Sequence, residues 1–259
     1  MRPRLTAAQD PERFVKDRPT TPATIVRPKA SQRKGRSANV ARIARAPTQE
    51  RSQRRFGEIL EAAQALLESA RIEDISFYDI AKKAGMSPAS VHYLFPSMAA
   101  VRLELNRRNN RDVVAFINEL ATELAKRGEP SWQQWVRSLA DGARHLVNGS
   151  RAASEILLGP ILNREGRLSN VESNIVVARS VVETLRAVFI MPDIPNLELK
   201  FGFGMEVFDA FWSRSYALHG RIDDEAFEES ICAVLAYLRT VLPEMLTLRA
   251  PAVQQEQKS

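Results

Sequence analysis

The chain has little of the chemistry that enzymes and secreted scaffolds use. It carries 1 cysteine and 3 histidines in 259 residues. The lone cysteine, Cys232, excludes an internal disulfide. His92, His145 and His219 lie far apart and show no metal-ligand spacing. There is no nucleophile motif and no glycine loop that could cradle a phosphate. We therefore expect no enzyme activity, no metal site and no cofactor.

Long apolar runs are also missing. No run approaches the roughly 18 residues that a membrane span needs. The N-terminus has no apolar segment of the kind found in signal peptides. Cys232 lies in an apolar helical run, where a small core residue is a better interpretation than a reactive thiol. These absences predict a soluble, cytoplasmic protein with no membrane partner.

Positive charge is concentrated at one end of the chain. Residues 1–55 contain 15 Lys and Arg against 4 Asp and Glu, whereas residues 56–259 contain 22 against 27. Residues 1–48 include 6 prolines and few large apolar residues, which predicts a disordered basic arm. Such an arm either contacts DNA phosphates or a minor groove, or is only a solvated tail. The sequence leaves both interpretations open.

Residues 76–98 carry the most informative pattern, which is that of a helix, a turn and a second helix. Ser76 and Asp79 are spaced as a capping box at the start of the first helix. Gly85 follows that helix, as a left-handed C-terminal cap does. Apolar residues at helical spacing pack the two helices against each other. They are Ile80, Ala81, Ala84, Val91, Leu94 and Phe95.

The second helix of this motif has a polar outer face. Ser87 caps it, and Pro88 occupies the first helical position, where its missing N–H costs nothing. Small residues followed by hydrogen-bonding side chains suit a helix that enters a DNA major groove. An ordinary helical hairpin is the alternative interpretation. The residues off the apolar stripe are Ala89, Ser90, His92 and Tyr93.

Helices are also expected on both sides of this motif. The preceding helix spans residues 49–69, and Arg54 and Arg55 near its start are placed to contact a DNA backbone. Apolar periodicity predicts helices through the rest of the chain, and there is no convincing strand. The first runs from Ser97 to a break at Gly128-Glu129-Pro130, and the second is capped by Ser131 and carries apolar residues as far as Leu146. The others cover approximately 151–163, 169–190, 197–219 and 223–248.

The stretch ALLESARIEDISFYDIAKKAGMSPASVHYLFPSM resembles the DNA-binding domain of the tetracycline-repressor (TetR) family, and the resemblance covers about residues 52–105. It implies a three-helix DNA-binding head, a helical C-terminal domain and a homodimer. Met98 stands where the family usually has a lysine. The resemblance implies backbone-contacting hydroxyls at Ser76 and Ser87, groove-facing residues at Pro88, Ala89 and Ser90, and a phosphate contact at His92, with Tyr93 adjacent.

The predicted fold class is all-α, with a helix-turn-helix head and a helical ligand-binding and dimerisation domain. We divide the chain into the arm at 1–48, the DNA-binding domain at 49–98, the regulatory domain at 99–248 and a flexible tail at 249–259. The last two long helices, 197–219 and 223–248, carry enough apolar surface to form an intersubunit four-helix bundle. Packing within one subunit is the alternative.

We predict a sequence-specific transcriptional regulator, a repressor that binds a near-palindromic double-stranded DNA operator as a homodimer. A small, largely apolar effector in the helical domain would release it. An effector-independent architectural or protein-recruiting DNA binder is the alternative. Some polar and aromatic residues of the helical domain could line a ligand cavity, although core and surface roles are more common. They are Trp132, Trp135, Arg144, His145 and Glu155.

Overall fold

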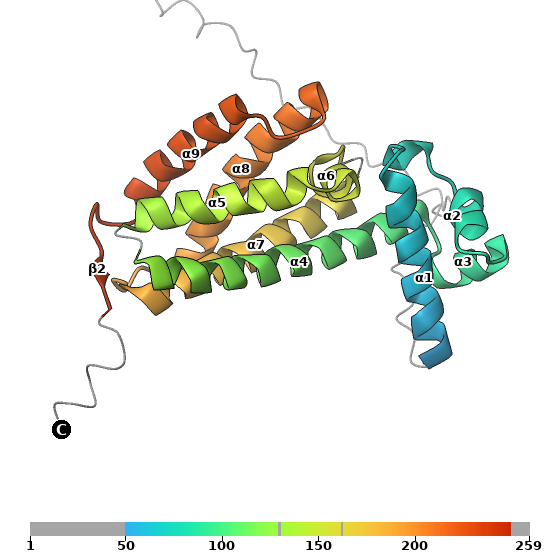
Figure 1. Cartoon of the computed structure of the whole chain (residues 1–259), viewed down its shortest axis with the longest axis horizontal. Helices are drawn as coiled ribbons and strands as arrows, with labels where there is room; N and C mark the ends of the chain where they lie inside the picture. Colours follow the sequence, from blue (N-terminus) through green and yellow to red (C-terminus); the bar gives the residue numbers. More distant parts are fainter. Residues whose placement is uncertain (1–49, 129–130, 162, 250–259) are drawn as a thin grey trace, which may run out of the picture. The chain divides into compact units, whose positions relative to one another are not determined.

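The computed structural model describes residues 50–128, 131–161 and 163–249 (Figure 1). Helices make up nearly all of these residues, which confirms the all-α prediction. The predicted arm at 1–48, and the predicted tail apart from Arg249, lie outside the described residues. The first elements are α1 (Glu50–Leu67), the 3₁₀ helix η2 (Ile72–Asp74), α2 (Phe77–Lys83), α3 (Pro88–Leu94) and α4 (Met98–Arg127). The later ones are α5 (Trp132–Asn148), α6 (Arg151–Leu158), α7 (Arg164–Val188), α8 (Leu197–His219) and α9 (Asp224–Arg239).

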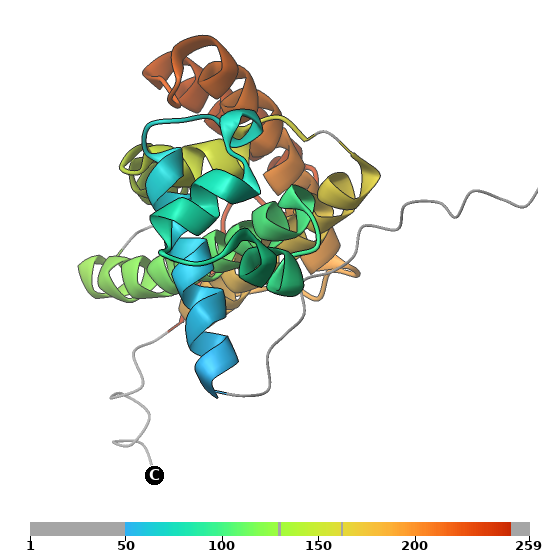
Figure 2. The ribbon, with the colours of Figure 1, turned by 90° about the vertical axis from the view of Figure 1, so that its right-hand side faces the viewer.

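The N-terminal domain consists of α1, α2, α3 and the first turns of α4, packed around one apolar core (Figure 2). The predicted periodicity of α1 is confirmed, because Ile59, Ala63 and Leu67 are buried on one face. The rings of Phe56 and Phe95 stack with centroids 4.6 Å apart and close the core at its edge. A compact core of this kind holds α2 and α3 in a fixed crossing.

The C-terminal domain is a bundle of α5, α7, α8, α9 and the remaining length of α4 (Figure 1). Asn163 caps α7 by accepting a hydrogen bond from the N–H of Gly166 at 2.8 Å. Helix α8 packs on α7 so closely that Gly202 lies against Ile175, where a Cβ would come within 2.5 Å of the Ile175 side chain. The bundle core is therefore continuous from α4 to α9.

Helix α6 belongs to both cores. Ala152 and Ile156 are buried in the apolar core of the N-terminal domain, whereas Leu158 is buried in the core of the bundle. The same short helix therefore takes part in the packing of the N-terminal domain and of the bundle.

Three predicted boundaries in the C-terminal domain were wrong. Helix α6 ends at Leu158 instead of continuing to 163, because Gly159 precedes Pro160 and proline disfavours a helical residue before it. Helix α7 begins at Arg164, five residues earlier than expected, and ends at Val188. The helix predicted over 223–248 ends at Arg239, a few residues before Pro243, which cannot continue a helix.

A short antiparallel strand pair was also missed. Strand β1 (Phe189–Ile190) pairs with β2 (Thr247–Leu248), with Phe189 opposite Leu248. The backbone N–H of Arg249 then donates to the Val188 carbonyl at 2.8 Å. Two residues on each side are too few for an alternation pattern, so this pair could not be predicted from residue spacing. It joins the end of the described chain to the end of α7.

None of the described helices combines the length and the apolar composition that crossing a membrane requires. Within the same residues there is also no cluster of three or more His, Cys, Asp or Glu side chains that could hold a metal ion.

Candidate nucleic-acid interface and effector cavity

The start of α2 has the predicted capping box. Ser76 Oγ accepts a hydrogen bond from the N–H of Asp79 at 3.3 Å, and Asp79 Oδ2 accepts one from the N–H of Ser76 at 3.0 Å. The hydroxyl of Ser76 also donates to Asp79 Oδ2. These hydrogen bonds from Ser76 hold the pKa of Asp79 below its usual range. The helix therefore begins at a defined residue.

The turn between α2 and α3 is a Schellman motif. Gly85 has a φ of +65°, which is the left-handed region that favours glycine. The N–H of Met86 donates to the Ala81 carbonyl at 2.9 Å, and that of Gly85 to the Lys82 carbonyl at 3.3 Å. The Met86 side chain packs against the core of the N-terminal domain. The turn predicted from Gly85 is thus confirmed.

Helix α3 presents its polar face outward. Ser87 Oγ caps it by accepting from the N–H of Ser90 at 3.3 Å, and Pro88 fills the first position. Val91 and Leu94 are buried on the inner face. Tyr93 is 64% exposed. Of the predicted outer-face residues, Ala89, His92 and Tyr93 are exposed and Ser90 is half-buried.

The two predicted arginines lie on the exposed side of α1. Arg54 Nε is 3.2 Å from Glu58 Oε1, one turn further along the helix. This ion pair is exposed to solvent, so it contributes little to stability and leaves the arginine available to a phosphate. Arg55 is also exposed. The structure therefore places both cations on the surface of the same domain as α3.

Two features of this surface were missed by sequence reasoning. Tyr78 on α2 is 66% exposed, which makes it as accessible as Tyr93. The ring of His92 lies against Phe77 of α2, with centroids 4.2 Å apart. The position of Tyr78, off the apolar stripe of its helix, was a signal that could have identified it. The His92 contact depends on how α2 and α3 cross, which spacing alone does not give.

Replacing Ser76 by alanine tests whether this residue only caps α2 or also contacts DNA. Losing an N-cap costs about 1 kcal/mol of stability. Ser131, which caps α5 by accepting from the N–H of Gln134 at 3.2 Å, is the matched control. We expect S76A and S131A to lower urea-unfolding stability similarly, and only S76A to weaken DNA binding. Equal DNA affinity in the two variants would leave Ser76 with a structural role alone.

The same variant has a pH signature. Because the folded state lowers the pKa of Asp79 from its ordinary 3.8, the capping box stabilises the protein above that value, and this stabilisation is lost as the pH falls through the lowered pKa. In S76A the pKa of Asp79 should rise toward 3.8. An NMR titration of the Asp79 carboxyl measures this directly, and an unchanged pKa would contradict the assignment.

The C-terminal domain encloses a bundle cavity of about 110 Å³ between α4, α5, α7 and α8. Most of its wall is apolar, with Leu139, Val177 and Phe208 among the lining residues. The polar end is formed by Asp209, whose Oδ2 accepts from the amides of Asn170 at 2.5 Å and Asn174 at 2.8 Å. Burial raises the pKa of Asp209 above its usual range. This cavity can hold a small apolar molecule with one polar group.

The residues that the sequence suggested as cavity lining do not line the bundle cavity. Trp132 and Trp135 are fully buried in the core, and their indole N–H groups donate to the Pro243 carbonyl and to Thr184 Oγ1. Arg144 pairs with Asp224, and His145 is exposed at 71% of its side chain. Their roles are the core and surface roles given as the alternative.

Glu155 connects the N-terminal domain to the bundle. It is 3% exposed on α6, and its Oε1 accepts from the N–H of Ile72 at 3.1 Å. Its Oε2 accepts from the hydroxyl of Tyr216 on α8, and burial together with this bond raises the pKa of Tyr216. Ser150 Oγ adds a second link by donating to Glu68 at 2.9 Å. A movement of α6 would therefore displace the groups of the N-terminal domain that are hydrogen-bonded to it.

Two capped helices joined by a left-handed glycine, with a polar outer face on the second, define a helix-turn-helix DNA-binding protein. Residues 59–105 match the family model described as "Bacterial regulatory proteins, tetR family". Over these residues the chain is similar to the DNA-binding domain of TetR-family regulators.

Solved structures share this fold over about three quarters of the chain. A TetR-family transcriptional regulator from Streptomyces coelicolor has a TM-score of 0.57 at 20% identity, covering 74% of this chain and 99% of that one. The structure of RolR in complex with resorcinol has a TM-score of 0.53 at 15% identity, and the match covers 74% of this chain and 89% of RolR. SmeT, the repressor of the Stenotrophomonas maltophilia multidrug efflux pump SmeDEF, has a TM-score of 0.50 at 12% identity. That match covers 75% of this chain and 94% of SmeT. No curated protein sequence matches the chain.

Proposed function

We propose that the protein is a TetR-family repressor that binds a near-palindromic operator as a homodimer and leaves it when a small effector binds. The observation that carries the proposal is the outer face of α3, where His92 and Tyr93 are exposed and Ser90 is half-buried, while Val91 and Leu94 are buried. Each α3 would enter a major groove of DNA. Two copies related by a two-fold axis would read two half-sites.

The backbone contacts of this proposal surround α3. Arg54 and Arg55 on α1 and Ser76 and Ser87 at the helix starts would bind phosphates, with Pro88 and Ala89 allowing close approach to the groove. Phosphate contacts set affinity for all sequences alike, whereas base contacts change preference at one position. Substituting either arginine should therefore lower affinity and salt dependence without altering the preferred sequence.

The domain boundaries we propose are 49–98 for DNA binding and 99–248 for regulation and dimerisation. Helix α6 crosses this division, because Ala152 and Ile156 pack in the core of the N-terminal domain. A fragment ending at residue 98 would therefore expose apolar surface that α6 covers in the whole chain.

The homodimer is proposed to form through the last two long helices. Leu199 and Phe203 lie one turn apart on α8 and are both exposed, and Phe203 is 54% exposed. On the neighbouring α7, Leu168 and Val176 are exposed as well. Within the described residues no large exposed apolar side chain lies on α9. We therefore place α8 at the centre of the interface, with α9 at its flank.

The effector proposal rests on the bundle cavity. An apolar cavity of about 150 Å³ can hold benzene. The bundle cavity, at about 110 Å³, would need to expand slightly to hold a single ring. RolR, which shares the fold, is in complex with resorcinol. A ligand can release DNA only by binding the two arrangements of the dimer with different affinity.

The proposal is tested with a selected operator placed before a reporter gene. Expression of the protein should lower transcription, and resorcinol or another single-ring phenol should restore it. The Met205 methyl group, which lines the bundle cavity, should change its NMR signal with the same ligand. Repression that no phenol relieves would favour the effector-independent alternative, and broad, sequence-poor DNA occupancy would favour an architectural role.

A further inference from the structure

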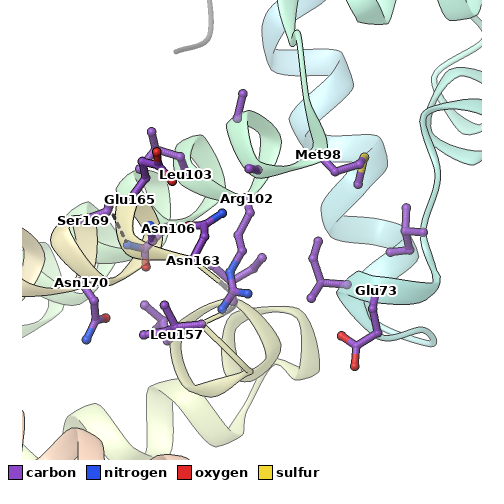
Figure 3. Close-up of a pocket in the computed structure, with 17 residues that line it drawn as sticks. Glu73, Met98, Arg102, Leu103, Asn106, Leu157, Asn163, Glu165, Ser169 and Asn170 are labelled. Carbon is purple, nitrogen blue, oxygen red and sulfur yellow. Dashed lines mark hydrogen bonds between the residues drawn. The ribbon is translucent and has the colours of Figure 1, made fainter. Parts of the chain in front are cut away.

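A second cavity, the junction cavity, lies where the N-terminal domain meets α6 and α7 (Figure 3). Its volume is about 250 Å³. It is a different space from the bundle cavity, although Leu157 and Asn170 border both. The junction cavity is lined from the N-terminal domain and α4 by Ile72, Ile75, Met98, Arg102 and Asn106, and from α6 and α7 by Ile156, Leu157, Ser169 and Asn170.

Arg102 is the charged centre of this cavity. Its side chain extends from α4 toward α6 (Figure 3). The guanidinium donates to the carbonyls of Gly159, at 3.2 Å, and Pro160, which follow the end of α6. Within the described residues it has these carbonyl partners and no ion pair at hydrogen-bond distance. Burial lowers the pKa of Arg102, and the more distant charges of Glu155 and Glu73 only partly offset this. A half-buried cation whose hydrogen-bond partners are carbonyls favours an anion beside it.

The rest of the wall combines apolar side chains with neutral amides. Asn106 is buried, and its Nδ2 reaches Ser173 Oγ and Ser169 Oγ only at 3.4 and 3.5 Å, which are long hydrogen bonds. Glu73 and Glu165 also line the cavity, but both are exposed to solvent, which screens their charge. The interior therefore offers one cation, the weakly engaged amide donor of Asn106 and an apolar floor.

We propose that the junction cavity binds a small single-ring aromatic carboxylate. The carboxylate would pair with the guanidinium of Arg102, which presents its N–H groups in the planar arrangement that a carboxylate matches. The ring would lie against Ile72, Ile75 and Leu157. An apolar cavity of about 150 Å³ accommodates benzene, so the junction cavity, at about 250 Å³, has room for the ring and its carboxylate.

Binding at this position would act on the N-terminal domain directly. The carboxylate would compete with the Gly159 and Pro160 carbonyls for Arg102 and so weaken the link between α4 and the end of α6. The ligand would also contact the side chain of Ile72, whose backbone N–H donates a hydrogen bond to Glu155. We expect operator affinity to fall by about fivefold or more when the cavity is filled, in the usual range of allosteric coupling. This effect rests on the proposed DNA-binding function, whereas ligand binding itself does not.

Methyl NMR of the full chain, labelled at its methionines, tests the site without DNA. Met98 lines the junction cavity and Met205 the bundle cavity, so each reports on one site. With benzoate as the probe, the Met98 signal should shift to saturation while the Met205 signal stays in place. Benzamide has the same shape without the charge, and it should bind at least about 10-fold more weakly.

Variants of Arg102 identify the group that binds the carboxylate. R102Q should weaken benzoate binding by about 10- to 100-fold, the usual effect of losing a charge-assisted hydrogen bond. R102K keeps the charge without the planar pair of donors and should bind with intermediate affinity. Arg111, exposed on the same helix and outside the cavity, provides the matched control R111Q, which should bind like the wild type. If R102Q fails to fold, R102K and benzamide still decide the question.

Several outcomes would overturn the proposal. They are an unmoved Met98 signal at saturating benzoate, a shift of Met205 alone, and equal affinity for benzoate and benzamide. Unchanged operator affinity with Met98 fully shifted would overturn the regulatory effect and leave the binding site in place. A failure of the proposed repressor function would instead appear as absence of operator binding by the unliganded protein.

Discussion

Replacing Tyr93 by alanine is expected to weaken operator binding by about 100-fold with little change in folding stability. The side chain is 64% exposed on the outer face of α3, so truncating it removes little buried surface. A dimer presents it twice, and a lost contact of about 1–1.5 kcal/mol in each half-site doubles to about 2–3 kcal/mol, or roughly 100-fold. Fluorescence anisotropy with a labelled operator, together with urea unfolding, measures both quantities.

Tyr78 provides the comparison for Tyr93, because it is an equally exposed tyrosine on α2. Y78A should weaken binding less than Y93A and equally for all DNA sequences, as a backbone contact would. H92A is a poorer probe, since the His92 ring also packs against Phe77. Wild-type operator affinity in Y93A, at unchanged stability, would contradict the role of α3.

Replacing Phe203 by glutamate is expected to turn the dimer into a monomer and to weaken operator binding by about 100-fold or more, because two-fold symmetry introduces two carboxylates into one apolar interface. Phe203 and Leu199 lie one turn apart on the outer face of α8, away from the bundle core. Since Phe203 is 54% exposed, the change should leave the folding of each subunit nearly intact. Sedimentation measures the mass in solution.

Met245 supplies a matched control for F203E, because it is also a large apolar side chain and is 86% exposed, but lies beyond α9 near β2. M245E should remain a dimer with wild-type operator affinity. A dimeric F203E would place the interface elsewhere, and a monomeric wild type that binds operator fully would remove the dimer from the account.

The helix-turn-helix was predictable because its determinants are local. The Ser76–Asp79 capping box, Gly85 at the turn and the Ser87–Pro88 start are each fixed by neighbours within a few residues. Local rules that agree with one another specify a structure strongly. The burial of Val91 and Leu94, and with it the exposure of Tyr93, followed from the same helical spacing.

Features that depend on distant contacts were not predictable. Glu155 binds Ile72 and Tyr216, which are 83 and 61 residues away in the chain, so no spacing pattern could connect them. The packing of α6 in two cores and the pairing of β1 with β2 also depend on residues that are far apart in the chain. Helix α9 was predicted too long because the apolar residues that follow it, such as Leu242, are buried without being helical.

If α3 reads bases in the major groove, its outer side chains decide which DNA sequences the protein prefers. We would select bound sequences from random DNA with the wild type and with S90A. The wild type should enrich two inverted half-sites, and S90A should lose preference at one position in each. Enrichment of no sequence by the wild type, or identical preferences in the two proteins, would contradict this role of α3.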